Sequence, residues 1–342
     1  MKNEAPALKI GSVRLDNPFI LAPMAGISNW PFRRLAKEAG AGLTVSEMVS
    51  AAALSFHGKA TLKLLETDPA LEKPFCVQLF GKEPETLARA AEVAVSRGAD
   101  LIDLNMGCPA RKVIGSGHGS ALLKNLAAAR PILAALRRAV SVPITVKTRP
   151  AFAPGAGGTV FDLLPMLVDE GVDAVTLHPR LTSQGFGGEA DWSLVERLAE
   201  VSPIPVIGSG DISSAADAVG RLRRHGAAAV MIGRGAKGRP WLFAECLALW
   251  RGESPPEATL DLRLQTADRH ARLLAASVGG KAPFMLRTVL MWYARGLRGS
   301  SEFRARLCRE DDLEIQLELL AECVERHRRE EGETAASRVK IC

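Results

Sequence analysis

A short unit recurs three times along the chain, each time as a glycine that follows a helix-like stretch and opens an apolar run. The copies begin at Gly98, Gly171 and Gly226. Glycine suits the left-handed turn that ends a helix, and a continuous apolar run is typical of a parallel strand buried on both faces. The repeat therefore predicts helix–turn–strand units and restricts the chain to α/β folds.

Apolar runs with strand character occur eight times, separated by helical patterns such as Glu83–Arg97 and Asp211–His225. Pro143 and Pro205 lie at the start of two runs, and a strand tolerates proline at its first residue. The eight candidates lie near residues 18–22, 43–47, 75–80, 100–105, 143–148, 172–178, 204–208 and 228–233. Eight strand–helix units over roughly 240 residues are typical of a (β/α)8 TIM barrel. A doubly wound open sheet is the alternative, but the usual Gly-x-Gly-x-x-Gly after the first strand is missing.

The pattern changes at Trp250–Pro256, which we interpret as a linker because of its glycine and prolines. Beyond it, leucine and alanine recur at helical spacing and no strand candidate appears. The sequence thus predicts a barrel domain over 1–248, a small all-helical domain over 249–328, and a polar, disordered tail over 329–342.

Composition narrows the class of protein. The hydrophobic fraction is 47%, yet no long uncharged apolar run predicts a membrane span, and the first residues lack the apolar stretch of a signal peptide. The six cysteines are scattered without a Cys-x-x-Cys pair, which argues against a metal site and a disulfide framework. We expect a cytoplasmic, monomeric protein without metal. A net charge of +6 permits a polyanionic partner.

Cys108 is the leading candidate for chemistry. It lies in Asn105–Pro109, directly after an apolar run, so it follows the C-terminal end of a predicted strand. Catalytic groups of parallel barrels lie at that end. The alternative is a small buried hydrophobic residue, since free cysteine is usually buried.

Other predicted strands also end in polar residues, among them Gln78, Asn105, Lys147 and His178. A buried lysine needs an anionic partner, and the reduced flavin ring offers one. The amides of Gln78 and Asn105 suit the pyrimidine edge of a flavin or a substrate base. The alternatives are a salt bridge for Lys147 and turn caps for the two amides.

The loops after the seventh and eighth strands are rich in glycine, and each leads into a helix. They read Gly208-Ser-Gly-Asp211 and Gly233-Arg-Gly235. Barrels often bind phosphate at these two loops through backbone N–H groups, and Arg234 would add a charge. We therefore expect a phosphate site here.

Residues 281–309 carry seven basic residues against one acid, with Trp292 and Tyr293 between them. This composition suits phosphate contacts together with a stacking platform for RNA bases. The alternative is an arginine-rich helix face whose aromatic residues pack inward. Arg111 and Lys112, just after Cys108, are further candidates for phosphate contacts.

Six motifs in order along the chain together resemble the tRNA-dihydrouridine synthase family, and the resemblance covers nearly the whole chain. They are Leu21–Gly26, Asn105–Pro109, Val146–Arg149, His178–Arg180, Glu189–Trp192 and Met231–Gly235.

The resemblance implies FMN in the barrel, NADPH as reductant, and reduction of the C5–C6 double bond of a uridine in tRNA, which we expect in the D-loop. It implies that Cys108 is the general acid. The cofactor residues are Pro23, Met24, Ala25, Gln78, Lys147, His178, Gly208, Ser209, Gly210, Asp211, Gly233 and Arg234. The substrate residues are Asn105, Arg111, Lys112, Arg180, Arg287, Arg295 and Arg298.

Four positions, His118, Leu181, Phe186 and Ser209, depart from the pattern common in that family. They bear on substrate contacts and on the choice of uridine. Two other functions stay open: a small-molecule pyrimidine oxidoreductase of the dihydroorotate dehydrogenase type, and a non-catalytic RNA-binding protein. The basic helical region argues against the first, and the intact Cys108 and Lys147 argue against the second.

Overall fold

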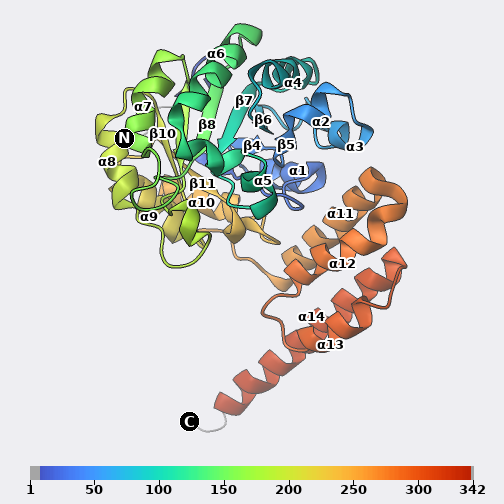
Figure 1. Cartoon of the computed structure of the whole chain (residues 1–342). Coiled ribbons are helices and arrows are strands. Elements are labelled where there is room, and N and C mark those ends of the chain that lie inside the picture. Colours follow the sequence, from blue (N-terminus) through green and yellow to red (C-terminus); the bar gives the residue numbers. More distant parts are fainter. Residues whose placement is uncertain (1–7, 340–342) are drawn as a thin grey trace. The chain divides into compact units, whose positions relative to one another are not determined.

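The structure, a computed structural model, describes the backbone of residues 8–339 and the side chains of residues 8–330 (Figure 1). The chain divides into two compact units. The barrel unit runs through Ala236 and includes Leu242–Pro255, and the helical unit comprises Lys237–Trp241 and the residues from Pro256 onward. The expected domain boundary at residue 249 falls inside helix α10 (Leu242–Arg251), which belongs to the barrel unit.

Eight parallel strands close into a barrel. Its strands are β3 (Phe19–Leu21), β4 (Leu43–Val45), β6 (Phe75–Phe80), β7 (Leu101–Met106), β8 (Ile144–Thr148), β9 (Ala174–Leu177), β10 (Val206–Ser209) and β11 (Ala229–Ile232). The sheet closes because β3 pairs with β11 and β4, and β4 pairs with β6. The predicted TIM barrel is confirmed, and this closure excludes the open doubly wound sheet.

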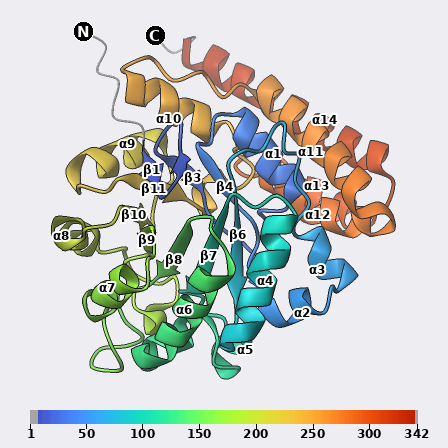
Figure 2. The same ribbon diagram turned by 90° about the horizontal axis from the view of Figure 1, so that it is seen from above.

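Helices surround the strands on the outside (Figure 2). They are α1 (Trp30–Glu38), α2 (Ala51–Ser55), α3 (Lys59–Lys63), α4 (Pro84–Ser96), α5 (Arg111–Gly115), α6 (Ala129–Ala139), α7 (Val160–Asp169), α8 (Ser193–Val201), α9 (Ala215–Arg224) and α10. The repeated glycines Gly98, Gly171 and Gly226 all have positive φ angles, between 61° and 99°. Each reverses the chain after a helix, as predicted, and so starts the next buried strand.

The barrel interior is apolar at one end and polar at the other. Cys76, Leu101 and Ile207 belong to an apolar inner cluster. The hairpin of β1 (Lys9–Ile10) and β2 (Val13–Arg14), which the sequence did not predict, contributes Ile10 to the same cluster. Side chains alternate along a strand, so the next inward residues toward the C-terminal ends are polar. We call this end of the barrel the mouth.

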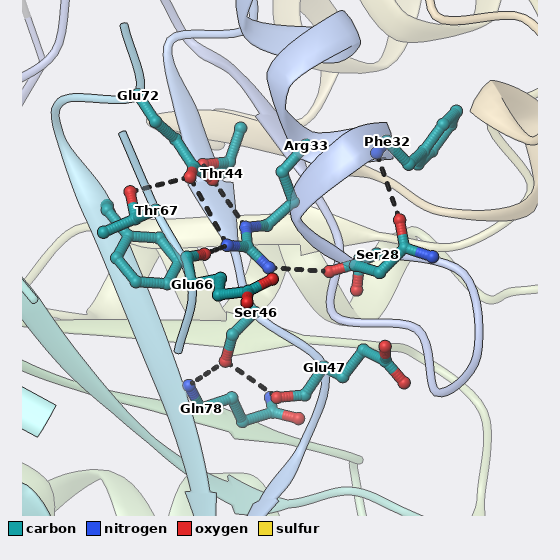
Figure 3. Close-up of polar contacts among 12 residues, drawn as sticks. Ser28, Phe32, Arg33, Thr44, Ser46, Glu47, Glu66, Thr67, Glu72 and Gln78 are labelled. Carbon is teal, nitrogen blue, oxygen red and sulfur yellow. Dashed lines mark hydrogen bonds and ion pairs between the residues drawn. The ribbon is translucent and has the colours of Figure 1, made fainter. Parts of the chain in front are cut away.

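A buried ion pair lies outside the barrel wall (Figure 3). Arg33 on α1 is fully buried, and its Nε is 2.5 Å from Glu72 Oε1. Thr44 and Thr67 donate hydrogen bonds to the same carboxylate, each at 2.8 Å. The guanidinium also lies 4.5 Å from the Phe75 ring centroid. These contacts join α1 to β4, β6 and the segment before β6.

The helical unit contains α11 (Leu260–Val278), α12 (Ala282–Tyr293), α13 (Ser300–Leu307) and α14 (Leu313–Val339). α11 packs against both α12 and α14. Because α14 continues to Val339, most of the expected tail is helical, and residues 340–342 lie outside the described part. Among the described residues, no helix combines the length and apolar character needed to cross a membrane.

Candidate active site

Cys108 lies in the loop after β7, and hydrogen bonds hold this loop at three points. The Cys108 N–H donates to Asn105 Oδ1 (3.0 Å), and Ser120 Oγ donates to the Cys108 carbonyl (2.8 Å). Arg149 Nε donates to the Gly107 carbonyl (2.8 Å). The side chain is partly exposed. These bonds hold the backbone of the loop and so place the partly exposed Cys108 side chain at the mouth.

A chain of hydrogen bonds crosses the polar layer beneath the thiol. Thr145 Oγ1 and Gln78 Nε2 donate to the two oxygens of Asp103, at 2.6 Å and 2.7 Å. Asn105 Nδ2 donates to Gln78 Oε1 at 2.8 Å. Ser46, at the end of β4, accepts from the backbone N–H of Gln78 (3.1 Å, Figure 3). Gln78 and Asn105, both predicted as ligand contacts, are thus also linked to each other.

Asp103 and Lys147 titrate nearer to neutral pH than usual. Burial raises the pKa of Asp103 to about 6, although hydrogen bonds from Thr145 and Gln78 act in the opposite direction. Burial lowers the pKa of Lys147 to about 8, against the attraction of Asp103. At pH 7 the layer therefore holds one carboxylate and one ammonium group, and Lys147 lies beside Asn105 in the register of β7 and β8.

His178, after β9, is kept neutral. Burial and then the charges of Lys147, Arg149 and Arg180 lower its pKa to about 2. Its Nε2 is buried and has no hydrogen-bond partner among the described residues. A neutral imidazole with a free nitrogen can donate to or accept from a bound ligand.

Arg180 is buried rather than extended toward solvent. Its Nη2 donates to Asp211 Oδ2 (2.7 Å) and its Nε to the Gly187 carbonyl (3.1 Å). Its Nη1 has no partner in the described part of the chain. Burial raises the pKa of Asp211, but hydrogen bonds from Arg180 and the Ala190 N–H, together with the charges of Arg180 and Arg234, lower it below its usual value.

The two glycine-rich loops lie at the mouth, but their glycines serve different purposes. A Cβ on Gly208 would lie 2.3 Å from the Trp192 ring, so this glycine makes room for packing outside the barrel. Gly210 has a φ of +125°, a conformation that favours glycine. Gly233 has room for a side chain, and Arg234 is exposed, with its Nη2 3.5 Å from Asp211 Oδ1.

The turn of Pro23, Met24 and Ala25 follows β3. Ser28 Oγ accepts from the Met24 N–H (2.8 Å), and Glu47 accepts from the Gly26 N–H. Burial raises the pKa of the Glu47 carboxyl. The turn is therefore held from the loop after β4.

The family departures also lie around this mouth. Phe186 is 59% exposed, and its ring lies 5.0 Å from the Arg234 guanidinium carbon and 6.4 Å from the His178 ring. Ser209 is buried at the end of β10, and the Leu181 carbonyl accepts from Arg149 (2.9 Å). The ring of His118 packs edge-on against Phe80.

The mouth suits an anionic ligand. Lys147, Arg149, Arg180 and Arg234 bring four cations to the ends of β8, β9 and β11, and the carboxylate of Asp211 contacts only two of them. The unpartnered Nη1 of Arg180 and Nε2 of His178 are donors that a bound group can satisfy. The donor set therefore fits a phosphate and the electron-rich edge of a flavin. Among the described residues, no cluster of three His, Cys, Asp or Glu residues could hold a metal ion.

The predicted substrate residues lie in three places: the mouth, helix α5 and the helical unit. Asn105 and the buried Arg180 lie in the mouth, and Arg111 and Lys112 are exposed on α5, directly after the Cys108 loop. Arg287 pairs with Asp311, and Arg298 pairs with Glu330 at 3.5 Å.

Arg295 lies elsewhere in the helical unit, at a cavity of about 390 Å³. Lys237 and Arg304 also line it, and no acidic residue does so in the described part of the chain. Arg295 and Arg304 form no ion pair with a described side chain, and burial and the Arg295 charge lower the pKa of Lys237. Trp292 and Tyr293, expected as stacking surfaces, are buried instead. The alternative of an inward-packed aromatic pair is therefore correct.

Sequence analysis missed Asp103 and Arg149 as site residues. Asp103 stands two positions before Asn105 in β7, so both side chains face inward. The sequence signal that could have identified Asp103 is a carboxylate within an otherwise apolar strand. Arg149 was noted in a motif, but its four backbone contacts depend on loops that the sequence does not place.

The fold is a closed parallel barrel of the TIM type, and in enzymes with this fold the catalytic groups lie at the C-terminal ends of the strands. The Cys108 loop, Lys147 and the arginines of the mouth lie at that end. The model of the dihydrouridine synthase family matches residues 20–328. The chain belongs to this family, and the predicted family is confirmed.

Curated relatives agree. A probable tRNA-dihydrouridine synthase of Rickettsia bellii is 37% identical over 299 residues, which cover 87% of this chain and 91% of that protein. The tRNA-dihydrouridine synthase B of Yersinia pestis is 37% identical over 317 residues, covering 92% and 98%.

Solved structures support the fold. An old yellow enzyme homologue from Zymomonas mobilis matches with a TM-score of 0.57 and 11% identity, over 75% of this chain and 95% of that chain. Histamine dehydrogenase from Rhizobium sp. 4-9 matches with a TM-score of 0.58 and 16% identity, over 72% and 48%.

Proposed function

We propose that this chain reduces the C5–C6 double bond of a uridine in tRNA to 5,6-dihydrouridine, with FMN held in the barrel mouth and NADPH as reductant. The observation that carries the proposal is the Cys108 loop, whose backbone is held by hydrogen bonds at a cationic, flavin-compatible mouth. The proposal includes a D-loop uridine and a monomeric, cytoplasmic enzyme.

The residues of the mouth would hold FMN as follows. The turn of Pro23–Ala25 would back the ring, and Gln78, Lys147 and His178 would contact its polar edge. Ser209, Gly210, Gly233 and Arg234 would bind the phosphate. When bound, the flavin would supply the hydride that adds to C6 of the uracil ring.

Cys108 would supply the proton. Hydride addition at C6 leaves negative charge on the uracil ring, and a proton must reach C5 to complete the product. A thiol can act as a general acid near neutral pH. The hydrogen bond that the Cys108 N–H donates to Asn105 and the one that Ser120 donates to the Cys108 carbonyl would hold the backbone while Sγ gives up the proton.

The tRNA would be held by cations that form no ion pair with a described side chain. Arg111 and Lys112 would bind phosphates beside the target nucleotide, which must leave its stack to reach the mouth. In the helical unit, Lys237, Arg295 and Arg304 would bind a backbone phosphate at their cavity. A free pyrimidine substrate would need no such site.

The direct test is Cys108→Ala, with Cys308→Ala as the matched control. Cys308 is exposed in the helical unit. We expect Cys108→Ala to retain bound flavin and normal reduction by NADPH, and to slow flavin reoxidation by tRNA by about 100-fold or more. We expect Cys308→Ala to behave as the unmodified protein. Normal reoxidation in Cys108→Ala would contradict the general-acid role.

The substrate is tested by mass spectrometry of tRNA nucleosides from a strain that lacks the gene, mapped by position. Loss of dihydrouridine at a D-loop position is the expected result. If the map is unchanged, and free pyrimidines reoxidise the reduced flavin while tRNA does not, the small-molecule alternative is correct.

A further inference from the structure

Asp103 is a buried carboxylate that the proposed reaction does not use. It is 2% exposed on β7, and its two oxygens accept from Thr145 and Gln78. Lys147 is the cation that acts on it. Burying a carboxylate is costly, so its position two residues before Asn105 calls for an explanation.

The first part of the explanation is direction. An ionised carboxylate can only accept hydrogen bonds. Gln78 must therefore turn its NH2 group toward Asp103, which leaves Oε1 facing Asn105. Asn105 must then turn its own NH2 group toward Gln78. Its Oδ1 consequently faces the other way, toward the Cys108 loop.

The second part comes from the opposite end of the chain of bonds. The backbone N–H groups of Gly107 and Cys108 can only donate, and both donate to Asn105 Oδ1, at 3.2 Å and 3.0 Å. An acceptor-only group at one end and donor-only groups at the other demand the same orientation of both amides. Reversing either amide would bring like groups face to face.

We propose that Asp103 is a positioning residue that fixes the orientation of the Gln78 and Asn105 amides and thereby the placement of Cys108 in the mouth. The catalytic consequence of this placement rests on the proposed role of Cys108, whereas the orientation itself does not. Asp103 also determines which groups Gln78 presents to a ligand at the mouth.

The test moves the carboxylate from position 103, at one end of the hydrogen-bonded chain, to position 105, at the other end. In Asp103→Asn, the amide at 103 can present either its Oδ1 or its NH2 group to Gln78, so the orientation of the Gln78 and Asn105 amides is no longer fixed from this end. In the double variant Asp103→Asn with Asn105→Asp, the carboxylate at 105 accepts from Gln78 and from the loop N–H groups. The two bonds of the Gln78 amide then run in the reverse direction, whereas the loop N–H groups still donate to residue 105.

The readout is alkylation of Cys108 by iodoacetamide relative to Cys308, measured by peptide mass spectrometry at pH 7.5 on the full chain. We expect the Cys108:Cys308 ratio to change by about tenfold in Asp103→Asn, as for loss of a buried hydrogen bond, and to return toward the original value in the double variant. An unchanged ratio in Asp103→Asn, or a double variant as altered as the single one, overturns the proposal.

Thr145→Val is the matched control. It removes the hydrogen bond that Thr145 donates to the Asp103 carboxylate, but it leaves the carboxylate that orients the Gln78 and Asn105 amides. We expect its ratio to stay near the original value, and a change as large as that of Asp103→Asn would indicate general loosening and overturn the proposal. If Asp103→Asn does not fold, a folded double variant with the original ratio supports the proposal, and an unfolded one overturns it. Turnover retained in Cys108→Ala would refute the proposed general-acid role of Cys108 without affecting the alkylation result.

Discussion

Both units form ion pairs at the surface, but only the barrel unit also buries charged side chains among the described residues. The barrel unit buries Arg33, Glu72, Asp103, Arg149 and Arg180. The helical unit buries no Asp, Glu, Lys or Arg among its described residues, and its arginines form surface pairs such as Arg272–Glu314 and Arg306–Glu322.

This difference separates two uses of charge. Buried charges with several fixed partners hold a site in one geometry, which is what electrostatic preorganisation requires. Exposed ion pairs contribute little to stability, so their cations can change partners when a polyanion binds. The barrel unit is thus built to position groups, and the helical unit to offer charge.

The largest expected contrast compares Arg33→Met with Arg272→Met. Arg33→Met leaves Glu72 buried without its cation, and we expect a loss of about 3–5 kcal/mol in the free energy of unfolding. Arg272 is exposed, so Arg272→Met should leave the urea midpoint unchanged within error. Equal shifts in the two urea midpoints would erase the distinction between the units.

A smaller contrast concerns acid stability, because the helical unit also has a buried titratable group, His270. Burial lowers its pKa to about 3. The unfolded chain, with a histidine pKa near 6.5, binds a proton that the folded chain does not. Stability is therefore lost as pH falls below about 6.5, by roughly 1.4 kcal/mol per pH unit.

We expect the melting temperature of His270→Phe to fall less between pH 7 and pH 5 than that of the unmodified protein. Tyr293→Phe is the control, because the Tyr293 hydroxyl and His270 Nδ1 are 3.1 Å apart and form the hydrogen bond that both changes remove. Tyr293→Phe keeps the imidazole, so its melting temperature should fall with pH as in the unmodified protein. An unchanged pH dependence in His270→Phe would show that other titratable groups cause the loss of stability in acid.

The smallest expected effect is on tRNA binding. Arg295→Ala removes a cation without an ion-pair partner in the described part of the chain, and should lower the slope of log affinity against log salt by about 0.7–0.9. Arg298→Ala removes a cation already paired with Glu330, and should change the slope less. The reverse order, measured by filter binding across a salt series, would move the RNA site away from the cavity.

The sequence predicted the barrel well because its signals are local. The glycines at 98, 171 and 226 end helices, and the runs that follow are strands. The β1–β2 hairpin was missed because two-residue strands carry no periodicity. Trp292 and Tyr293 were assigned to a stacking surface because a basic, aromatic composition does not tell which face of α12 packs inward.

The site was predicted less completely than the fold. The residues at strand ends were found because a barrel brings those ends together. The hydrogen bonds between these residues were not predicted. The bonds from Asp103 through Gln78 to Asn105 join β6 and β7, and the register of these two strands, which the sequence does not give, brings the amides together. The loop contacts of Arg149 span up to 42 positions in the sequence.

The Arg149 guanidinium has a consequence for how this enzyme can change. It donates to the carbonyls of Gly107, Arg180, Leu181 and Gly185, and so ties the loops after β7, β8 and β9 together. Barrel enzymes usually acquire new specificities by varying one loop at a time. Here one guanidinium group holds three loops, so a change in the backbone of one loop affects the position of the other two. A loop grafted from another barrel must therefore keep the backbone carbonyl that accepts from Arg149.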